Sequence, residues 1–193
     1  QKFLLANNIT AMQAVREVGA ARDSLFEDRL ISRHFSKPGV SPFDEVGWRK
    51  TEVTVVNRDG TETKRELEFP EFWSDQAARI AGSKYFRGQI GSDKWESSAR
   101  QMINRVVKVI SGWGLKSGYF KKREADIFSV ELASILLNQR AAFNSPVWFN
   151  VGIDAKPQCS ACFILSVEDS MQSLLAWVST EGLIFKTGSG AGV

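Results

Sequence analysis

The chain has 193 residues, of which 43% are hydrophobic and 24% are charged, and its formal net charge is +3 at pH 7. This length holds one domain, or a small domain plus part of another, and the composition is that of a globular protein. Basic and acidic residues are interspersed, which argues against a nucleic-acid-binding protein with a basic face. The apolar runs are short and interrupted, so we expect neither a membrane-spanning helix nor a membrane partner.

The two cysteines, Cys159 and Cys162, are too few for a secreted disulfide framework, and the N-terminus lacks the pattern of a signal peptide. We therefore expect a cytoplasmic, reducing location. His34 is the one histidine, so the chain has no second histidine with which to build a metal site or a Ser/His or Cys/His pair. We expect no metal site, and we interpret His34 as a cation at a helix end.

Helical patterns dominate the first 140 residues. Apolar residues recur at helical spacing in three stretches, weakly over residues 1–35 and clearly over 97–113 and 126–138. In the second stretch Arg105 falls outside the apolar stripe, and Gly112 and Gly114 are expected to end the helix. The region therefore predicts a scaffold of helices, which by itself indicates no chemistry.

One β-hairpin interrupts this helical scaffold. Residues of alternating character flank the pair Asp59-Gly60, which is typical of a tight turn, so we predict a hairpin at about residues 51–69. Pro70 is expected to end the hairpin and to open a helix at Phe72 and Trp73, because proline is tolerated in the first turn.

Two stretches combine aromatic and polar residues. Residues 83–88 (Ser-Lys-Tyr-Phe-Arg-Gly) could stack a base or hold a phosphate, although a packed loop whose arginine caps a carbonyl is commoner. Asn144 and Ser145 lie among aromatic residues, either as the lip of a pocket or in a turn in which they bond their own backbone. Pro146 favours an extended backbone at Ser145.

Cys159 and Cys162 have C-x-x-C spacing, but zinc would need two ligands besides this pair, and the chain offers only His34. Residues 161–165 read as the start of a buried strand rather than the helix N-terminus of a redox pair. On a strand the two cysteines would point to opposite faces, so one could face a site while the other packs. Structural burial is the common fate of a cysteine and stays the alternative.

A helix is expected after Glu168. Asp169 as N-cap with Gln172 fits a capping box, and the buried stripe would consist of Met171, Leu174, Leu175 and Val178. Asp169 could instead bond the hydroxyls of a ribose. The loop that follows has glycine at every second position from Gly188 to Gly192, which lets backbone amides approach an anion, with Lys186 as the matching cation. It matches neither the dinucleotide fingerprint nor a Walker loop.

In combination and order, these segments resemble adenosylcobalamin-dependent (class II) ribonucleotide reductases. The matching runs are Phe-Asn-Ser-Pro-Val-Trp-Phe-Asn-Val-Gly, Pro-Gln-Cys-Ser-Ala-Cys-Phe-Ile, Val-Glu-Asp-Ser-Met and Thr-Glu-Gly-Leu-Ile-Phe-Lys-Thr-Gly-Ser-Gly. Upstream, Pro-Gly-Val-Ser-Pro-Phe-Asp-Glu-Val and Ser-Lys-Tyr-Phe-Arg-Gly-Gln look like the same family's N-terminal region. The resemblance runs from about His34 to Val193.

The resemblance implies an α+β fold. Residues 1–140 would form a mainly helical N-terminal region with the hairpin, and residues 141–193 the first strand and helix of a ten-stranded α/β barrel, which is incomplete here. The family's thiyl-radical cysteine and its second reducing cysteine have no candidate in this chain. We therefore expect an N-terminal fragment that is inactive alone, and whose unpaired first strand favours association.

The resemblance also implies roles for individual residues. Cys162 matches the cysteine that reduces the 2′ position of the ribose together with a second cysteine, the two ending as a disulfide, whereas Cys159 matches a residue that is not a reductant. The positions that match substrate-binding segments are Ser145, Ala161, Gly190 and Gly192. The positions that match the site of the allosteric effector are Asp169, Ser170 and Lys186.

The implied function is conversion of ribonucleotides to deoxyribonucleotides by cobalamin-initiated thiyl-radical chemistry. In the complete enzyme the cofactor would be adenosylcobalamin. Its partners would be a deoxynucleoside triphosphate effector, a thioredoxin-like reductant and a second copy of the chain. The alternative is a non-catalytic nucleotide-binding or regulatory module that keeps the effector site and has lost the chemistry. The substitution Cys162→Ser distinguishes the two, because only the enzyme would lose an activity.

Overall fold

A computed structural model describes residues 31–56, 59–88, 92 and 95–193. Most of the helix expected over residues 1–35 lies outside these ranges. Residues 31–35 are described and are not helical, so the expected helix does not extend to His34. The elements in chain order are η1 (Pro42–Asp44), β1 (Trp48–Val56), β2 (Glu62–Pro70), α2 (Asp75–Ile80), η2 (Ala81–Tyr85), α3 (Ala99–Lys116), α4 (Lys122–Leu137), α5 (Ser145–Asn150), β3 (Cys162–Ile164), α6 (Met171–Lys186) and β4 (Gly190–Gly192). The α+β class is confirmed, whereas a barrel stays a prediction.

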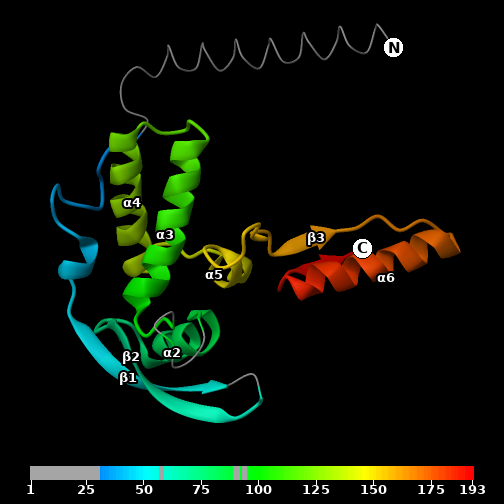
Figure 1. The fold of residues 1–193 in the computed structure, drawn as a ribbon, viewed down its shortest axis with the longest axis horizontal. Coiled ribbons are helices and arrows are strands. Elements are labelled where there is room, and N and C mark those ends of the chain that lie inside the picture. The colour runs from blue at the N-terminus through cyan, green and yellow to red at the C-terminus, as the bar shows by residue number, and fades with distance from the viewer. Residues whose placement is uncertain (1–30, 57–58, 89–91, 93–94) are drawn as a thin grey trace, which may run out of the picture.

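The described residues form a body and an arm (Figure 1). In the body, α3 and α4 stand side by side above the hairpin and α2. The arm consists of β3, α6 and β4 and extends from the body beyond the short helix α5. Among the described residues, none of the helices is long and apolar enough to cross a membrane.

The predicted hairpin is confirmed. Strands β1 and β2 pair antiparallel from Trp48 opposite Pro70 to Val56 opposite Glu62. Because side chains alternate between the two faces of a strand, one face of the hairpin is buried. The hydrophobic side chains buried on this face are Val53, Val55, Leu67 and Phe69. At the turn, the Asp59 carboxylate accepts a hydrogen bond from the Thr61 amide.

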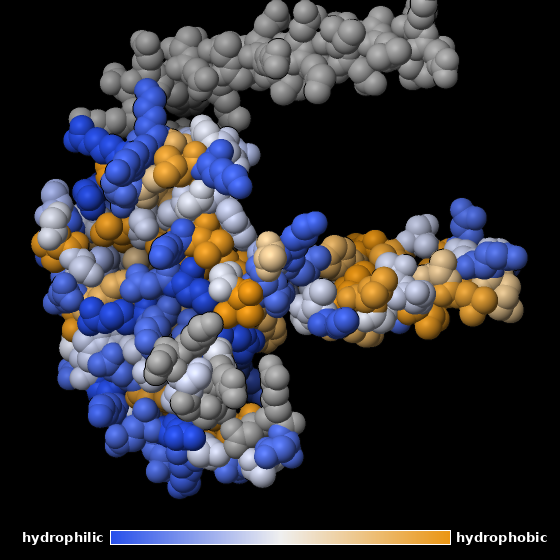
Figure 2. Space-filling view, in the orientation of Figure 1, coloured by the Kyte–Doolittle hydropathy of each residue, from blue (hydrophilic) through white to orange (hydrophobic). Residues whose placement is uncertain are grey.

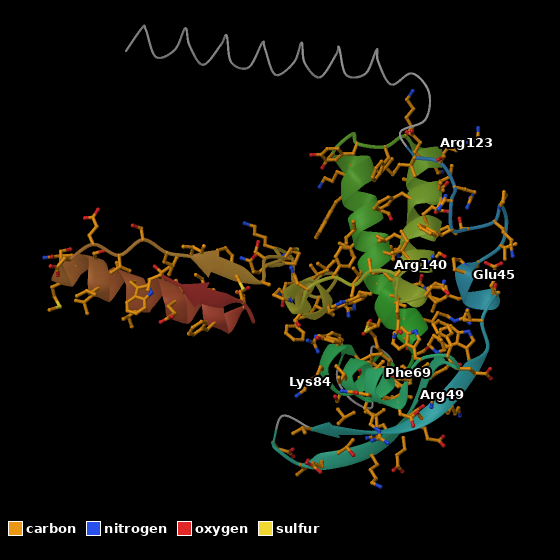
Figure 3. All side chains as sticks on the ribbon, turned by 180° about the vertical axis from the view of Figure 1, so that it is seen from behind. Glu45, Arg49, Phe69, Lys84, Arg123 and Arg140 are labelled. Carbon is orange, nitrogen blue, oxygen red and sulfur yellow. The ribbon has the colours of Figure 1, made fainter. Side chains whose placement is uncertain are left out.

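The helix start expected at Phe72 and Trp73 is wrong. Strand β2 runs through Pro70, and α2 begins only at Asp75, because the Ser74 hydroxyl accepts from the Ala77 amide and caps the helix there. Arg49 of β1 holds the junction (Figure 3), donating to the Trp73 carbonyl and the Asp75 carboxylate, each at 2.8 Å.

The expected end of the helix at Gly112 and Gly114 is also wrong, because α3 continues to Lys116. A Cβ on Gly114 would lie 2.1 Å from a ring carbon of Phe120, so this glycine permits close packing inside the helix rather than stopping it. The helix ends one turn later, before Gly118, whose φ of +75° is the left-handed conformation typical of a helix stop.

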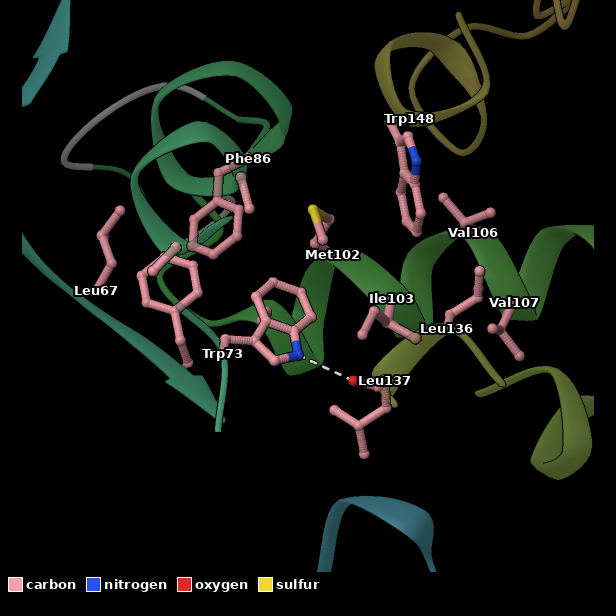
Figure 4. Close-up of a cluster of buried hydrophobic side chains, with 14 of the residues drawn as sticks. Leu67, Trp73, Phe86, Met102, Ile103, Val106, Val107, Leu136, Leu137 and Trp148 are labelled. Atoms are coloured by element: carbon pink, nitrogen blue, oxygen red, sulfur yellow. Dashed lines mark hydrogen bonds between the residues drawn. The ribbon is translucent and has the colours of Figure 1, made fainter. Parts of the chain in front are cut away.

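The core of the body joins segments distant in sequence (Figure 4). Side chains of α3 and α4 pack against aromatic residues from the hairpin side and against α5; among them are Phe69, Trp73, Phe86, Met102, Ile103, Val106, Leu136, Leu137 and Trp148. The Trp73 indole N–H donates to the Leu137 carbonyl at 2.9 Å. Helix α5 therefore packs into this core, although the division of the chain at residues 140 and 141 stays a prediction.

A buried carboxylate ties the start of the described chain to α4. Glu131 accepts hydrogen bonds from the amides of Phe35 (2.8 Å) and Ser36 (2.9 Å) and from the Ser36 hydroxyl. Burial raises the pKa of Glu131, but these hydrogen bonds and one from the His34 amide together lower it below its ordinary value of 4.5. The ionised carboxylate thus holds this segment on the body.

In the arm, the expected burial is absent. None of the residues of α6 is buried, and Met171 of the predicted buried stripe is 66% exposed. Strand β3 was expected to be buried, yet Ile164 is 91% exposed. Figure 2 shows hydrophobic residues gathered on the surface of the arm. The pattern of an inner strand and helix is present, but among the described residues no layer covers them.

Candidate functional site

Strands β3 and β4 bring four of the candidate residues together. They pair in parallel with Cys162 opposite Gly190 and Ile164 opposite Gly192. The Gly190 amide donates to the Ala161 carbonyl at 2.7 Å, and next to it the Ser189 hydroxyl donates to the Ser160 carbonyl at 2.6 Å. The glycine-rich loop is therefore fixed beside the cysteine segment.

The neighbour of the Cys162 sulfur is a glycine. A Cβ built on Gly190 would lie 3.9 Å from Cys162 Sγ and 3.7 Å from the Ala161 carbonyl oxygen, so a methyl group there would be in ordinary van der Waals contact with the thiol. Because the Gly190 amide is used in the sheet, this glycine provides space beside the thiol rather than a hydrogen bond to a ligand. Cys162 itself is exposed.

The two cysteines have different environments, as expected, and neither forms a disulfide. Cys159 is half-buried and packs against the core of the body, and burial raises the pKa of its thiol. The opposite-face argument does not account for this difference, because β3 begins at Cys162 and Cys159 lies before it. Cys159 packs because the chain here still runs along α5.

Helix α5 connects this pair of strands to the body. The Asn144 side chain caps α5 by accepting from the Val147 amide, and its Nδ2 donates to the Cys159 carbonyl at 3.0 Å. The expected turn in which Asn144 bonds its own backbone is thus a helix cap. The expectation of an extended Ser145 is wrong, because Ser145 lies in the first turn of α5, where proline at the next position is tolerated, and Asn144 is the extended residue.

Asn150, at the other end of α5, holds both segments of the arm. It is buried, and its Nδ2 donates to the carbonyls of Gln158 (2.9 Å) and Thr187 (3.1 Å). The first carbonyl lies just before the cysteine segment, and the second lies between α6 and the glycine-rich loop. One amide group therefore sets the distance between the two segments that carry Cys162 and Gly190.

Arg105 fixes α5 on the body and corrects the sequence interpretation that placed it outside the packed face of α3. Its guanidinium donates to the Trp148 carbonyl (3.1 Å), to the Val151 carbonyl (2.6 Å) and to Glu96 (2.7 Å). A signal was present in the sequence: Arg105 stands three residues after Met102 and four before Val109, on the flank of the apolar stripe.

Residues 83–88 are packed, as in the commoner interpretation, although residues 83–85 belong to η2 and only residues 86–88 form a loop. Arg87 donates to the carbonyls of Lys84 (2.8 Å) and Phe149 (3.2 Å), and its guanidinium lies 4.6 Å from the centre of the Phe149 ring. Burial and the charge of Arg105 lower the pKa of Arg87. Arg87 therefore caps backbone carbonyls, as in the commoner interpretation.

The candidate effector residues lie at opposite ends of α6. The N-cap is Ser170, whose hydroxyl accepts from the Ser173 amide, so the predicted capping role of Asp169 is wrong and its carboxylate is exposed. Lys186 ends the helix, and a helix of 16 residues is about 24 Å long. Within one chain, Lys186 is therefore far from Asp169 and Ser170.

The hollow on the hairpin of the described chain is too small for a cobalamin. This hollow has a volume of about 270 Å³ and is lined by Glu52, Val53, Thr54, Lys64, Arg79 and Ser83. This volume is below the ~300–1,000 Å³ typical of sites for drug-sized ligands, and a corrin with its side chains is larger still. Within the described part of the chain, no group of three or more His, Cys, Asp or Glu could hold a metal ion.

Comparison with known proteins identifies the class. A family model described as "Class II vitamin B12-dependent ribonucleotide reductase" matches residues 49–139. The vitamin B12-dependent ribonucleotide reductases of Streptomyces coelicolor and Streptomyces avermitilis are each 51% identical to the chain over 167 residues, and that of Streptomyces clavuligerus is 50% identical. These matches cover 84% of this chain and 17% of each relative.

The chain therefore belongs to the class II vitamin B12-dependent ribonucleotide reductases. It spans about 17% of the length of the curated relatives that it matches. The resemblance seen in the sequence motifs is confirmed, and so is the family's dependence on vitamin B12.

Proposed function

We propose that this chain acts as part of a ribonucleotide reductase in which Cys162 is one of two thiols that reduce the ribose. The observation that carries the proposal is the exposed Cys162 thiol, beside which Gly190 places no side chain. Membership of the family and the order of the motifs support the same role.

The reaction requires two electrons. The C2′–O bond of the ribonucleotide breaks and a C2′–H bond forms in its place, while the hydroxyl leaves as water. The two thiols supply the two electrons and the two hydrogens, one to C2′ and one to the water, and become a disulfide, which a thioredoxin-like dithiol reduces again. Cys162 contributes one thiol. The other must come from outside these 193 residues, because Cys159 is held by α5 and the core and burial raises the pKa of its thiol. When bound, adenosylcobalamin would supply the initiating radical.

Substrate binding would use α5 and the two strands. Ser145 offers a half-buried hydroxyl at the start of α5, and the segments around Ala161 and Gly192 offer backbone groups. Gly190 would act by leaving space. We further propose that β3 and α6 are the first strand and helix of a ten-stranded barrel, whose remaining strands would cover the exposed side chains of the arm.

The allosteric site would lie at the N-terminus of α6. Its free amides favour a phosphate, and the exposed Asp169 carboxylate can accept from a sugar hydroxyl. Because Lys186 is at the far end of the same helix, its contribution would come from the second copy of the chain in a homodimer.

The test is Cys162→Ser in the reductase polypeptide that carries this sequence, with Cys159→Ser as the matched control. We expect Cys162→Ser to abolish deoxynucleotide formation while deoxynucleoside triphosphate binding is kept, and Cys159→Ser to remain active. If Cys162→Ser changes neither deoxynucleotide formation nor effector binding, this part of the polypeptide does not supply a reducing thiol, which supports the non-catalytic nucleotide-binding module.

A second assay addresses the chain by itself. The 193-residue polypeptide is incubated with adenosylcobalamin, a ribonucleotide and a dithiol. We expect no deoxynucleotide, because only one reducing thiol is supplied. Product formation would contradict the proposed division of the chemistry.

A further inference from the structure

The hydroxyl of Tyr85 lies 3.0 Å from that of Ser145. Tyr85 ends the π-helical turn η2, sixty residues before Ser145, and lies within the region that matches the family model. Both side chains are half-buried. This hydrogen bond connects the N-terminal body directly to the serine that the proposed function assigns to the substrate.

Tyr85 is held firmly from several sides. The Phe86 amide donates to the Ala81 carbonyl, which closes the wide turn that places Tyr85 at α5. The Tyr85 ring packs against Phe149 and Trp148, with ring centres 5.5 Å and 6.4 Å away. Its carbonyl accepts from Arg105 at 3.4 Å. The phenol oxygen is thus placed by packing and not by the bond to Ser145 alone.

The direction of this hydrogen bond decides what Ser145 can do. Each hydroxyl has one proton to donate and lone pairs that accept. If Ser145 donated to Tyr85, its proton would be used and the serine could only accept, which does not suit an anionic phosphate. If Tyr85 donates, the serine proton remains available, and the chain of two hydrogen bonds polarises it further.

We propose that Tyr85 is a positioning residue for substrate binding. It donates to Ser145 Oγ, fixes the rotation of that hydroxyl and directs its proton towards the phosphate of the ribonucleotide. The inference rests on the proposed role of Ser145 as a substrate contact. It also gives the N-terminal body a part in the reaction beyond support of the fold.

The experiment compares Tyr85→Phe, Ser145→Ala and the double variant in the reductase polypeptide that carries this sequence, with a ribonucleoside di- or triphosphate as substrate. Tyr85→Phe removes one oxygen and keeps the ring. We expect its KM for the ribonucleotide to rise about 2- to 12-fold, the size of one net hydrogen bond, with kcat nearly unchanged. The double variant should match Ser145→Ala, because the two hydroxyls act as one unit. Tyr119→Phe is the matched control, since Tyr119, the other tyrosine of the chain, is 70% exposed.

Four outcomes overturn the proposal. If Ser145→Ala raises KM but Tyr85→Phe does not, or if the effects of the two variants simply add, Tyr85 does not act through Ser145, and the proposed function stands. The same holds if Tyr85→Phe lowers the unfolding temperature without changing KM, because that indicates a structural role. If both Ser145→Ala and Cys162→Ser leave the reaction intact, the proposed function fails and the role of Tyr85 with it.

Discussion

Arg105 Nε lies 2.7 Å from Glu96 Oε1, and the two side chains are only 11% and 9% exposed. The same carboxylate accepts from the Arg87 amide at 2.9 Å, so the loop before α3 is tied to this pair. Through Arg105 the pair reaches the carbonyls of α5. The position of α5, and with it that of Ser145, therefore depends on one buried ion pair.

Breaking this ion pair should strongly destabilise the body. Arg105→Met leaves Glu96 buried without its main partner and leaves two carbonyls of α5 unsatisfied, so we expect a loss of about 3–5 kcal/mol in the free energy of unfolding, measured by urea denaturation. Glu52→Gln is the control, because the Glu52–Lys64 pair has a similar length of 2.8 Å but is exposed. We expect no measurable change there. Equal effects of the two variants would contradict the role of burial.

Stability should fall in acid through Glu131. Its pKa is lower in the folded chain than in the unfolded chain, so its contribution is complete above about pH 4.5 and is lost as the pH falls through the folded-state value. Glu131→Gln should cost about 1–3 kcal/mol at pH 7 and flatten the acid limb of a plot of unfolding free energy against pH. An acid limb identical to that of the unmodified chain would show that other carboxylates are responsible.

The two thiols should differ in reactivity. Iodoacetamide reacts with the thiolate, and we expect Cys162 to be labelled several-fold faster than Cys159 at pH 7.5, because Cys162 is exposed while burial both shields Cys159 and raises the pKa of its thiol. The difference between the two labelling rates should become smaller as the pH is raised and more of the Cys159 thiol ionises. Peptide mass spectrometry separates the two sites. Faster labelling of Cys159 would contradict the packing described for it.

Filling the space beside Cys162 should leave the fold intact. Gly190→Ala places a methyl group at ordinary contact distance from the sulfur, so we expect little change in stability but a several-fold slower alkylation of Cys162. Gly192→Ala is the matched control, because a Cβ there meets nothing within 4 Å. If both variants react at the same rate, Gly190 does not control access to the thiol.

The exposed apolar side chains of α6 should make the isolated chain associate. Leu175 and Val178 are among these side chains, and burial of such a surface is favourable. We expect Leu175→Lys combined with Val178→Lys to reduce self-association, measured by sedimentation. Gln172→Lys, also an exposed position of α6, controls for the added charge. Unchanged sedimentation of the double variant would show that another surface mediates association.

Local sequence patterns were sufficient to predict elements whose contacts are with residues nearby in the sequence. The hairpin followed from alternation around Asp59-Gly60, because pairing and turn geometry are both decided within residues 48–70. The helices α3 and α4 followed from their apolar spacing. The order of the short motifs likewise indicated the family, which the comparisons confirmed.

Tertiary structure decided what distant segments supply to one another. From the sequence, Gly114 is read as a helix stop, but in the structure it allows the Phe120 ring to pack against the helix. Arg105 is read as a surface residue, but in the structure it donates to Glu96 and to the Val151 carbonyl after α5. In the candidate site, the sequence alone identified Cys162 and the glycine-rich loop. It did not predict the register of the two strands, the hydrogen bond from Asn150 to the Thr187 carbonyl or the hydrogen bond between Tyr85 and Ser145. The periodicity of a sequence indicates which face of a helix or strand is apolar. A buried polar contact instead depends on a partner distant in sequence, and only the folded chain determines where that partner lies.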